Sequence, residues 1–118
     1  MLSSFSTCQE VTNEDLLGCW SHSYEEDGEA FKGEVYRACD YKDFPASRFR
    51  FTLELLKEGQ CKWLVLSPTD GHYMDDGTWN FEKPSNQLSV FNNQGVLVKE
   101  YEVKGLKDRV LLLLSRLD

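Results

Sequence analysis

The side chains best suited to chemistry begin in the stretch from Asp15 to Glu26, which reads DLLGCWSHSYEE. Alternate side chains of an extended strand share a face, so Trp20, His22 and Tyr24 would lie together. An imidazole and a phenol above an indole are convergent polar groups over an apolar floor, the usual makeup of a small-molecule site. The alternative is a strand that twists outward and exposes both polar side chains to water.

Arginine side chains offer a second kind of chemistry, the pairing of an anion. Arg37 follows Tyr36 on a second predicted strand, and Arg48 and Arg50 open a third. A guanidinium that turns inward would pair a carboxylate, because a buried cation needs a counter-charge. Arg48 and Arg50 lie opposite an apolar face, so Arg37 is the preferred anion contact and Arg48 the second. Solvation at the surface is the alternative for these side chains.

Metal and catalytic motifs are not evident. The segment 67–77, SPTDGHYMDDG, holds His72 among several aspartates, but TDG and DDG are ordinary turn sequences, so no metal site is predicted. The sequence contains neither a G-x-S-x-G elbow nor an H-E-x-x-H helix. Cys39 or Cys61 beside His22 could be imagined as a nucleophile and base, but small strand cysteines usually belong to a core. We predict no catalytic residue and no cofactor.

The elements that position these side chains are short strands. Turn signals rich in Gly, Asn and Asp recur between apolar runs of about five to ten residues, a spacing typical of an all-β sandwich or barrel. The segment TNED, 12–15, resembles a helical turn capped by Thr12. We predict eight antiparallel strands near 16–25, 33–38, 48–57, 60–67, 75–82, 87–92, 96–103 and 109–117.

The length and net charge of the chain restrict its possible functions. The 118 residues predict one domain, 12–118, after a loose N-terminal segment, 1–11. Twenty acidic against 13 basic residues give a net charge of −7, which disfavours nucleic acid and anionic membranes as partners. The longest apolar run, Val110 to Leu114, is too short to span a bilayer, and the N-terminus lacks the pattern of a secretory signal. These features predict an intracellular, cytoplasmic protein.

The four cysteines, Cys8, Cys19, Cys39 and Cys61, contain no C-x-x-C pair. Structural zinc sites use closely spaced ligand pairs, so zinc is not predicted. Four free thiols in a reducing compartment are the preferred interpretation. A disulfide, for example from Cys39 to Cys61, stays open as the alternative.

The strand faces follow from the period of two. Residues 62–66 and 110–114 are apolar on both faces, so a loop, the N-terminal segment or a second subunit must cover their outer side, and a homodimer through 109–117 is one candidate. Lys99 interrupts the apolar face of 97–103. The side chains predicted to face inward are Trp20, Phe49, Phe51, Leu53, Trp63, Trp79, Phe81, Leu88, Val90, Leu97, Tyr101, Leu112 and Leu114.

Together, these elements resemble the lipocalin and fatty-acid-binding (calycin) superfamily. The resemblance is carried by Gly18-Cys19-Trp20 after a helical turn, by eight strands, and by Arg109 at the start of the last one. Small lipocalin-like domains also carry segments similar to 34–38, 45–48 and 67–79. The resemblance implies an up-and-down β-barrel whose end Gly18 and Trp20 close, with Arg109 stacked on the indole; Arg116 is the competing arginine.

The resemblance also implies a function, the non-covalent binding of a small hydrophobic molecule, with or without a carboxylate, in the barrel. Haem is not expected, because the last histidine is His72 and the haem-binding branch uses one near the C-terminus. Two alternatives stay open: a filled barrel that acts as an interaction module, and a cofactor-free lyase or isomerase. The predicted ligand contacts are His22, Tyr24, Tyr36, Arg37, Arg48 and Trp63, with His72 and Tyr73 at the barrel mouth.

Overall fold

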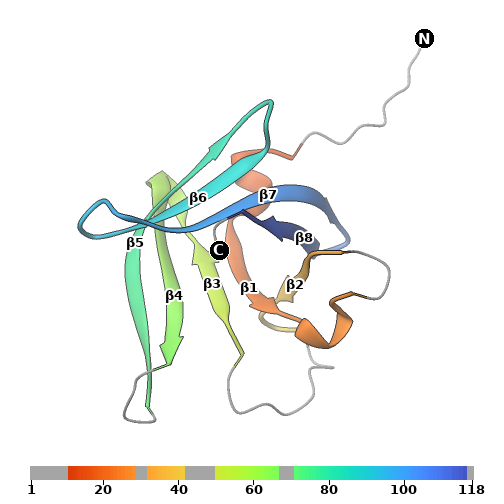
Figure 1. Ribbon diagram of the computed structural model, residues 1–118, viewed down its shortest axis with the longest axis horizontal. Helices are drawn as coiled ribbons and strands as arrows, with labels where there is room; N and C mark the ends of the chain where they lie inside the picture. The colour runs from red at the N-terminus through yellow and green to blue at the C-terminus, as the bar shows by residue number, and fades with distance from the viewer. Residues whose placement is uncertain (1–10, 29–31, 42–49, 67–70, 117–118) are drawn as a thin grey trace.

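The computed structural model describes residues 11–28, 32–41, 50–66 and 71–116. Eight antiparallel strands close into a barrel in the order β1-β2-β8-β7-β6-β5-β4-β3, which confirms the predicted fold class (Figure 1). The predicted loose segment lies outside the described residues, apart from Val11. The strands are β1 (Gly18–His22), β2 (Glu34–Ala38), β3 (Thr52–Leu55), β4 (Gln60–Leu66), β5 (His72–Glu82), β6 (Gln87–Asn92), β7 (Leu97–Lys107) and β8 (Val110–Ser115).

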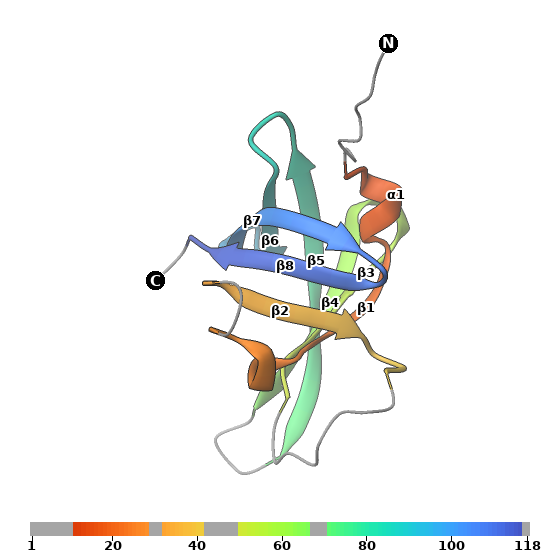
Figure 2. The same cartoon turned by 90° about the vertical axis from the view of Figure 1, so that its right-hand side faces the viewer.

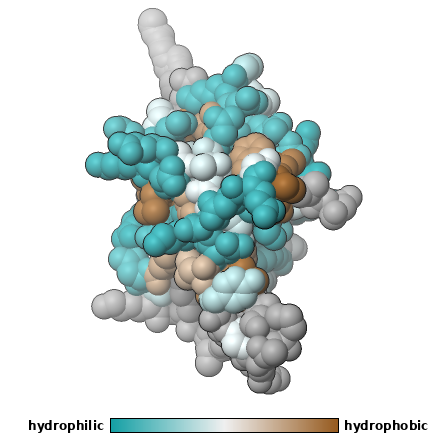
Figure 3. Space-filling model, turned by 90° about the vertical axis from the view of Figure 1, so that its left-hand side faces the viewer, coloured by the Kyte–Doolittle hydropathy of each residue, from teal (hydrophilic) through white to brown (hydrophobic). Residues whose placement is uncertain are grey.

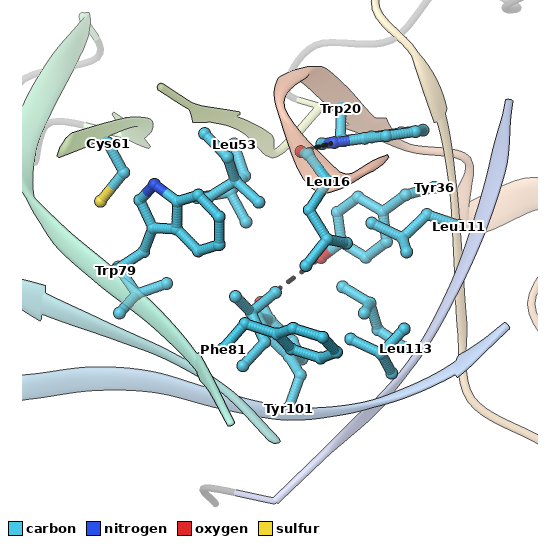
Figure 4. Packing of buried hydrophobic residues seen from close by; sticks show 14 of the residues in the cluster. Leu16, Trp20, Tyr36, Leu53, Cys61, Trp79, Phe81, Tyr101, Leu111 and Leu113 are labelled. Atoms are coloured by element: carbon cyan, nitrogen blue, oxygen red, sulfur yellow. Dashed lines mark hydrogen bonds between the residues drawn. The ribbon is translucent and has the colours of Figure 1, made fainter. Parts of the chain in front are cut away.

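A single helical turn, α1 (Asn13–Leu16), closes one end of the barrel. Thr12 caps it as predicted: its hydroxyl accepts from the Asp15 backbone N–H, and the Asp15 carboxylate accepts from the Thr12 N–H. Leu16 is fully buried, and its carbonyl accepts a hydrogen bond of 2.9 Å from the Trp20 indole (Figure 4). Figure 2 shows α1 beside the ends of β1 and β3. We call this the closed end.

The first strand is shorter than predicted. It ends at His22, and a 3-10 turn, η2 (Tyr24–Glu26), follows. The Ser23 hydroxyl donates to the Glu26 carboxylate, a local side-chain bond that competes with strand continuation. Tyr24 therefore leaves the face of Trp20 and is 43% exposed, so the prediction that it shares this face is wrong.

The last hairpin also differs from the prediction. β7 continues through 104–107, which had the composition of a turn, and the reversal lies at Asp108 and Arg109. Both residues adopt left-handed backbone angles, with φ of 54° and 62°. Two positive φ values match the twist of a tight hairpin, although Asn-Gly is the usual sequence for it. The second short 3-10 turn, η3 (Lys57–Gly59), joins β3 to β4.

Side chains from all eight strands and α1 fill the closed end and the middle of the barrel (Figure 4). β8 contributes Leu111 and Leu113, both fully buried, so the prediction that Leu112 and Leu114 face inward is wrong. Because residues 110–114 are apolar on both faces, the period of two could not show which of these side chains face inward. The pairing with β2 shows it, since Leu111 pairs with the inward-facing Tyr36.

The face of β7 is set by an irregularity in its pairing with β6. Val90 pairs with Lys99 but Phe91 pairs with Leu97, so the register shifts between them. Val98, rather than the predicted Leu97, packs against the core, while Tyr101 is buried as expected.

β5 extends beyond its neighbour β6. The two strands pair from Gly77 to Glu82, whereas β5 pairs with β4 from His72 to Thr78. Residues 72–76 therefore have β4 as their one strand neighbour in the described parts of the chain. Figure 1 shows β4 and β5 continuing side by side to the lower edge of the molecule.

A disulfide joins Cys19 to Cys39 on the outer face of the β1–β2 pair. The prediction of four free thiols is therefore wrong for these two residues, and the alternative Cys39–Cys61 pair is wrong as well. Cys39 directly follows β2, and its N–H donates to the Cys19 carbonyl, so the two residues lie opposite each other. Cys61 is free and buried, and burial raises its thiol pKa to about 11. Cys8 lies outside the described residues.

Candidate functional site

We call the end of the barrel opposite α1 the open end. Here β1 and β4 finish while β2, β3, β5 and β7 begin. Side chains that face the interior are buried in the middle of the barrel but only half-buried at this end. We name the half-buried inward-facing set the open-end ring: His22, Glu34, Phe51, Val65, Asp75 and Lys99.

His22 is held at the open end by three contacts. Its Nε2 lies 2.6 Å from Asp27 Oδ2, and its ring stacks on Tyr36 with centroids 4.9 Å apart and planes 17° apart. Asp27 is fixed in turn, because its Oδ1 accepts from the Val35 N–H at 2.9 Å. The His22 N–H donates to the Phe51 carbonyl. These contacts fix the orientation of the imidazole.

Tyr36 and Tyr101 form the floor beneath the open-end ring. The Tyr36 hydroxyl donates to Glu34 at 2.9 Å and lies 3.5 Å from the Tyr101 hydroxyl, the contact drawn across the interior in Figure 4. Burial raises the pKa of both phenols well above the ordinary value of a tyrosine. Both hydroxyls thus stay protonated at neutral pH and act as hydrogen-bonding groups, not as phenolate bases.

Lys99 is a cation that faces the interior. It pairs with Val90, which is fully buried, and cross-strand partners share a face. Its Nζ lies 4.8 Å from the centroid of the Phe51 ring. Sequence reasoning did not choose Lys99 as a contact, although its position as the one charge on an apolar face was the available signal.

Arg37, the preferred anion contact in the sequence, is engaged elsewhere. Its guanidinium makes a bidentate pair with Glu26, at 2.6 and 2.9 Å, and lies 4.4 Å from the Tyr41 ring centroid. It projects from the outer face of β2, between the inward-facing Tyr36 and Ala38. The structure thus separates Arg37 from the open-end ring.

The other predicted contacts are dispersed. Trp63 is buried in the core and contributes its indole to the wall below Val65. Tyr73 is 51% exposed near the start of β5. Arg48 and the side chain of His72 lie outside the described parts of the chain. Of the predicted contacts, the structure brings together His22, Tyr36 and Tyr24, since the Tyr24 ring lies edge-on to His22 with centroids 6.0 Å apart. Tyr73 pairs with Val65 of the open-end ring.

η2 is attached to the barrel by a second ion pair. The Arg50 guanidinium donates to both Glu25 oxygens, at 2.8 and 2.6 Å, and also to the His22 carbonyl. Arg50 additionally lies 4.8 Å from the Tyr24 ring centroid. The hydrogen bonds from Arg50 lower the pKa of Glu25 to about 2.

This shift predicts how the pair depends on pH. A depressed carboxyl pKa stabilises the fold above the unfolded value of about 4.5, and this contribution is lost as pH falls toward 2. We expect Glu25→Gln to flatten the fall in the free energy of unfolding between these pH values, measured by urea denaturation. Glu58→Gln, at an exposed carboxylate in η3, is the control and should keep the wild-type profile. Identical profiles for Glu25→Gln and the wild type would contradict the assignment.

The residues expected to close the barrel are only partly arranged as predicted. Trp20 is buried at the closed end, and Gly18, with φ of 133°, begins β1 there. Arg109 is 70% exposed in the β7–β8 turn and pairs with Asp40 at 2.9 Å. Among the cation–ring contacts between described residues, none joins Arg109 or Arg116 to Trp20.

Three surface hollows that the described residues line lie at the closed end. Their volumes are about 270, 390 and 530 Å³. The first lies between Trp20 and Arg109, the second between Arg37 and Arg109, and the third between α1, η3 and Trp79. The first two are lined in part by exposed charged residues of the β7–β8 turn, and the third has an apolar part formed by Leu17, Leu56 and Trp79.

Within the described ranges, no group of three His, Cys, Asp or Glu side chains could hold a metal ion, and no helix has the length and apolarity to cross a membrane. Comparisons with protein-family models, with curated proteins and with solved structures find no match to this chain.

Proposed function

We propose that this lipocalin-like barrel binds a small, largely apolar molecule non-covalently at its open end. The observation that carries the proposal is the contrast in burial along the interior. The middle of the barrel is filled, whereas the inward-facing open-end ring is half-buried. An eight-stranded barrel is just wide enough to hold one small ligand, so an incompletely filled end is where one fits.

The chemistry of the open-end ring supports this proposal. Phe51 and Val65 supply apolar wall, and His22 and Glu34 supply a few fixed polar groups, which is the usual makeup of a small-molecule site. The contacts of His22 with Asp27 and Tyr36 orient its ring in advance, which lowers the ordering cost of binding.

The first test is a fluorescence titration with N-phenylnaphthylamine, a neutral apolar dye. We expect saturable binding to the wild type, and about fivefold weaker binding to Phe51→Ala, because a phenyl wall of the site is lost. Phe91→Ala is the matched control, since Phe91 pairs with the exposed Thr78 on the outer face. Near-ultraviolet circular dichroism verifies that both variants fold. Absence of saturable binding to the wild type would contradict the proposed function.

A cofactor-free lyase or isomerase is the second candidate, favoured by the His22–Asp27 couple. A carboxylate 2.6 Å from an imidazole is the arrangement that orients a general base. The variant His22→Gln separates the two functions. An enzyme that uses this couple would lose turnover, whereas a carrier has no turnover to lose and would still bind the dye.

The interaction-module alternative has less support. Val110, Leu112 and Leu114 on the outer face of β8 are half-buried within the single chain. Figure 3 shows the opposite side of the molecule, where hydrophilic side chains surround separate, small hydrophobic patches. Stable homodimer interfaces are usually larger and more continuous.

The disulfide bears on the proposed location. Disulfides persist in oxidising compartments and are rare in the cytosol, so Cys19–Cys39 argues against the cytoplasmic location predicted from the sequence. The compartment stays a prediction that fractionation of cells would test.

A further inference from the structure

We propose that Lys99 recognises an anionic group on the ligand, so that the barrel selects an apolar molecule with one carboxylate or equivalent acid. This inference rests on the proposed function and adds the chemical class of the ligand.

The position of Lys99 is the first support. β7 and β3 are separated by three other strands in the sheet order. A contact of Lys99 Nζ with the Phe51 ring, next to β3, therefore crosses the interior and does not run along the sheet. Tyr36 packs edge-on against the same ring, with centroids 6.4 Å apart. The ammonium thus lies above the aromatic floor of the open end, where the head group of a ligand would be.

The charge balance is the second support. No carboxylate of the described residues forms an ion pair with Lys99, although the chain has 20 acidic residues and a net charge of −7. When the ammonium of a half-buried lysine contacts only an aromatic face, its positive charge is incompletely compensated. An anion can then supply the missing partner. Five other cations have carboxylate partners: Arg37, Arg50, Lys104, Arg109 and Arg116. Four further described lysines form no ion pair with a described carboxylate, but they are exposed to water, whereas Lys99 is half-buried; these four are Lys32, Lys57, Lys62 and Lys107.

Glu34 limits the number of anionic groups that a ligand can carry. It belongs to the open-end ring, faces the interior opposite Leu113, and accepts the Tyr36 hydroxyl hydrogen bond. A second anionic group on the ligand would meet this carboxylate and be repelled. The arrangement therefore favours a monoanion with an apolar body.

Two dyes with the same aromatic body test the proposal. N-phenylnaphthylamine is neutral, and anilinonaphthalene sulfonate carries one anionic group on that body. We expect Lys99→Met to weaken sulfonate binding about tenfold and to change binding of the neutral dye less than about twofold. Lys104→Met is the matched control, because it removes an exposed lysine of the same strand that pairs with Glu102. It should leave both affinities unchanged.

Lys99→Arg keeps the charge and is expected to keep the preference for the sulfonate. Unchanged sulfonate affinity in Lys99→Met would overturn the role of Lys99, while binding of the neutral dye would still support the barrel as a carrier. If neither dye binds the wild type, the proposed function fails together with this inference. Loss of the sulfonate preference in Lys104→Met would also overturn the assignment, because the effect would then be one of net charge.

Discussion

Gly77→Ala is expected to lower the free energy of unfolding by about 3 kcal/mol, the upper part of the range for overpacking a core. A Cβ at Gly77 would overlap the Phe91 carbonyl oxygen and lie 3.0 Å from the Asn92 Cα. These are backbone atoms of β6 in register with β5, so they cannot move aside without breaking strand pairs of the closed barrel.

Gly71→Ala is the matched control for this prediction. A Cβ at Gly71 meets nothing within 4 Å, so its effect should stay within about 0.5 kcal/mol. Urea denaturation followed by tryptophan fluorescence measures both variants against the wild type. Equal, small effects at the two glycines would show that β5 and β6 do not pair in this register.

Removal of the Cys19–Cys39 disulfide is expected to cost about 3 kcal/mol, because the cross-link restricts the unfolded chain. The bond closes a sequence separation of 20 residues that includes η2 and the attached His22. The double variant Cys19→Ala, Cys39→Ala should therefore lose this stability, and thermal unfolding monitored by circular dichroism measures the loss.

The wild type treated with a reductant provides the internal comparison, since it should unfold at nearly the temperature of the double variant. Intact mass before and after reduction reports whether the bond is present. The purified, air-exposed protein is reduced without alkylation for this comparison. If reduction then added no hydrogens to its mass, the Cys19–Cys39 pairing would be refuted.

The sequence allowed the barrel to be predicted because its local signals agree. Recurrent Gly, Asn and Asp turns separate strands with alternating faces, and Thr12 has the type and position of a helix cap. The faces of residues 110–114 could not be predicted, because an apolar run has no alternation to interpret. The continuation of β7 through Gly105 could not be predicted either, since glycine and lysine there resemble a turn.

The site was less predictable, because it depends on contacts between distant segments. The inward position of His22 followed from the period of two. The pairing of Arg37 with Glu26 did not, since it requires η2 to fold back over β2. Lys99 was visible as an exception on its strand, but its contact with Phe51 depends on closure of the barrel.

Residues 72–76 of β5, which pair with β4 but not with β6, have a consequence for self-association. A strand with open backbone groups can template the addition of another strand, and the exposed Tyr73 and Met74 would add apolar contact to such a pairing. Asp75 and Asp76 follow directly, and an approaching copy would carry the same two charges. Electrostatic repulsion between these charges therefore opposes fibril-like stacking at this edge, and the repulsion weakens at high salt.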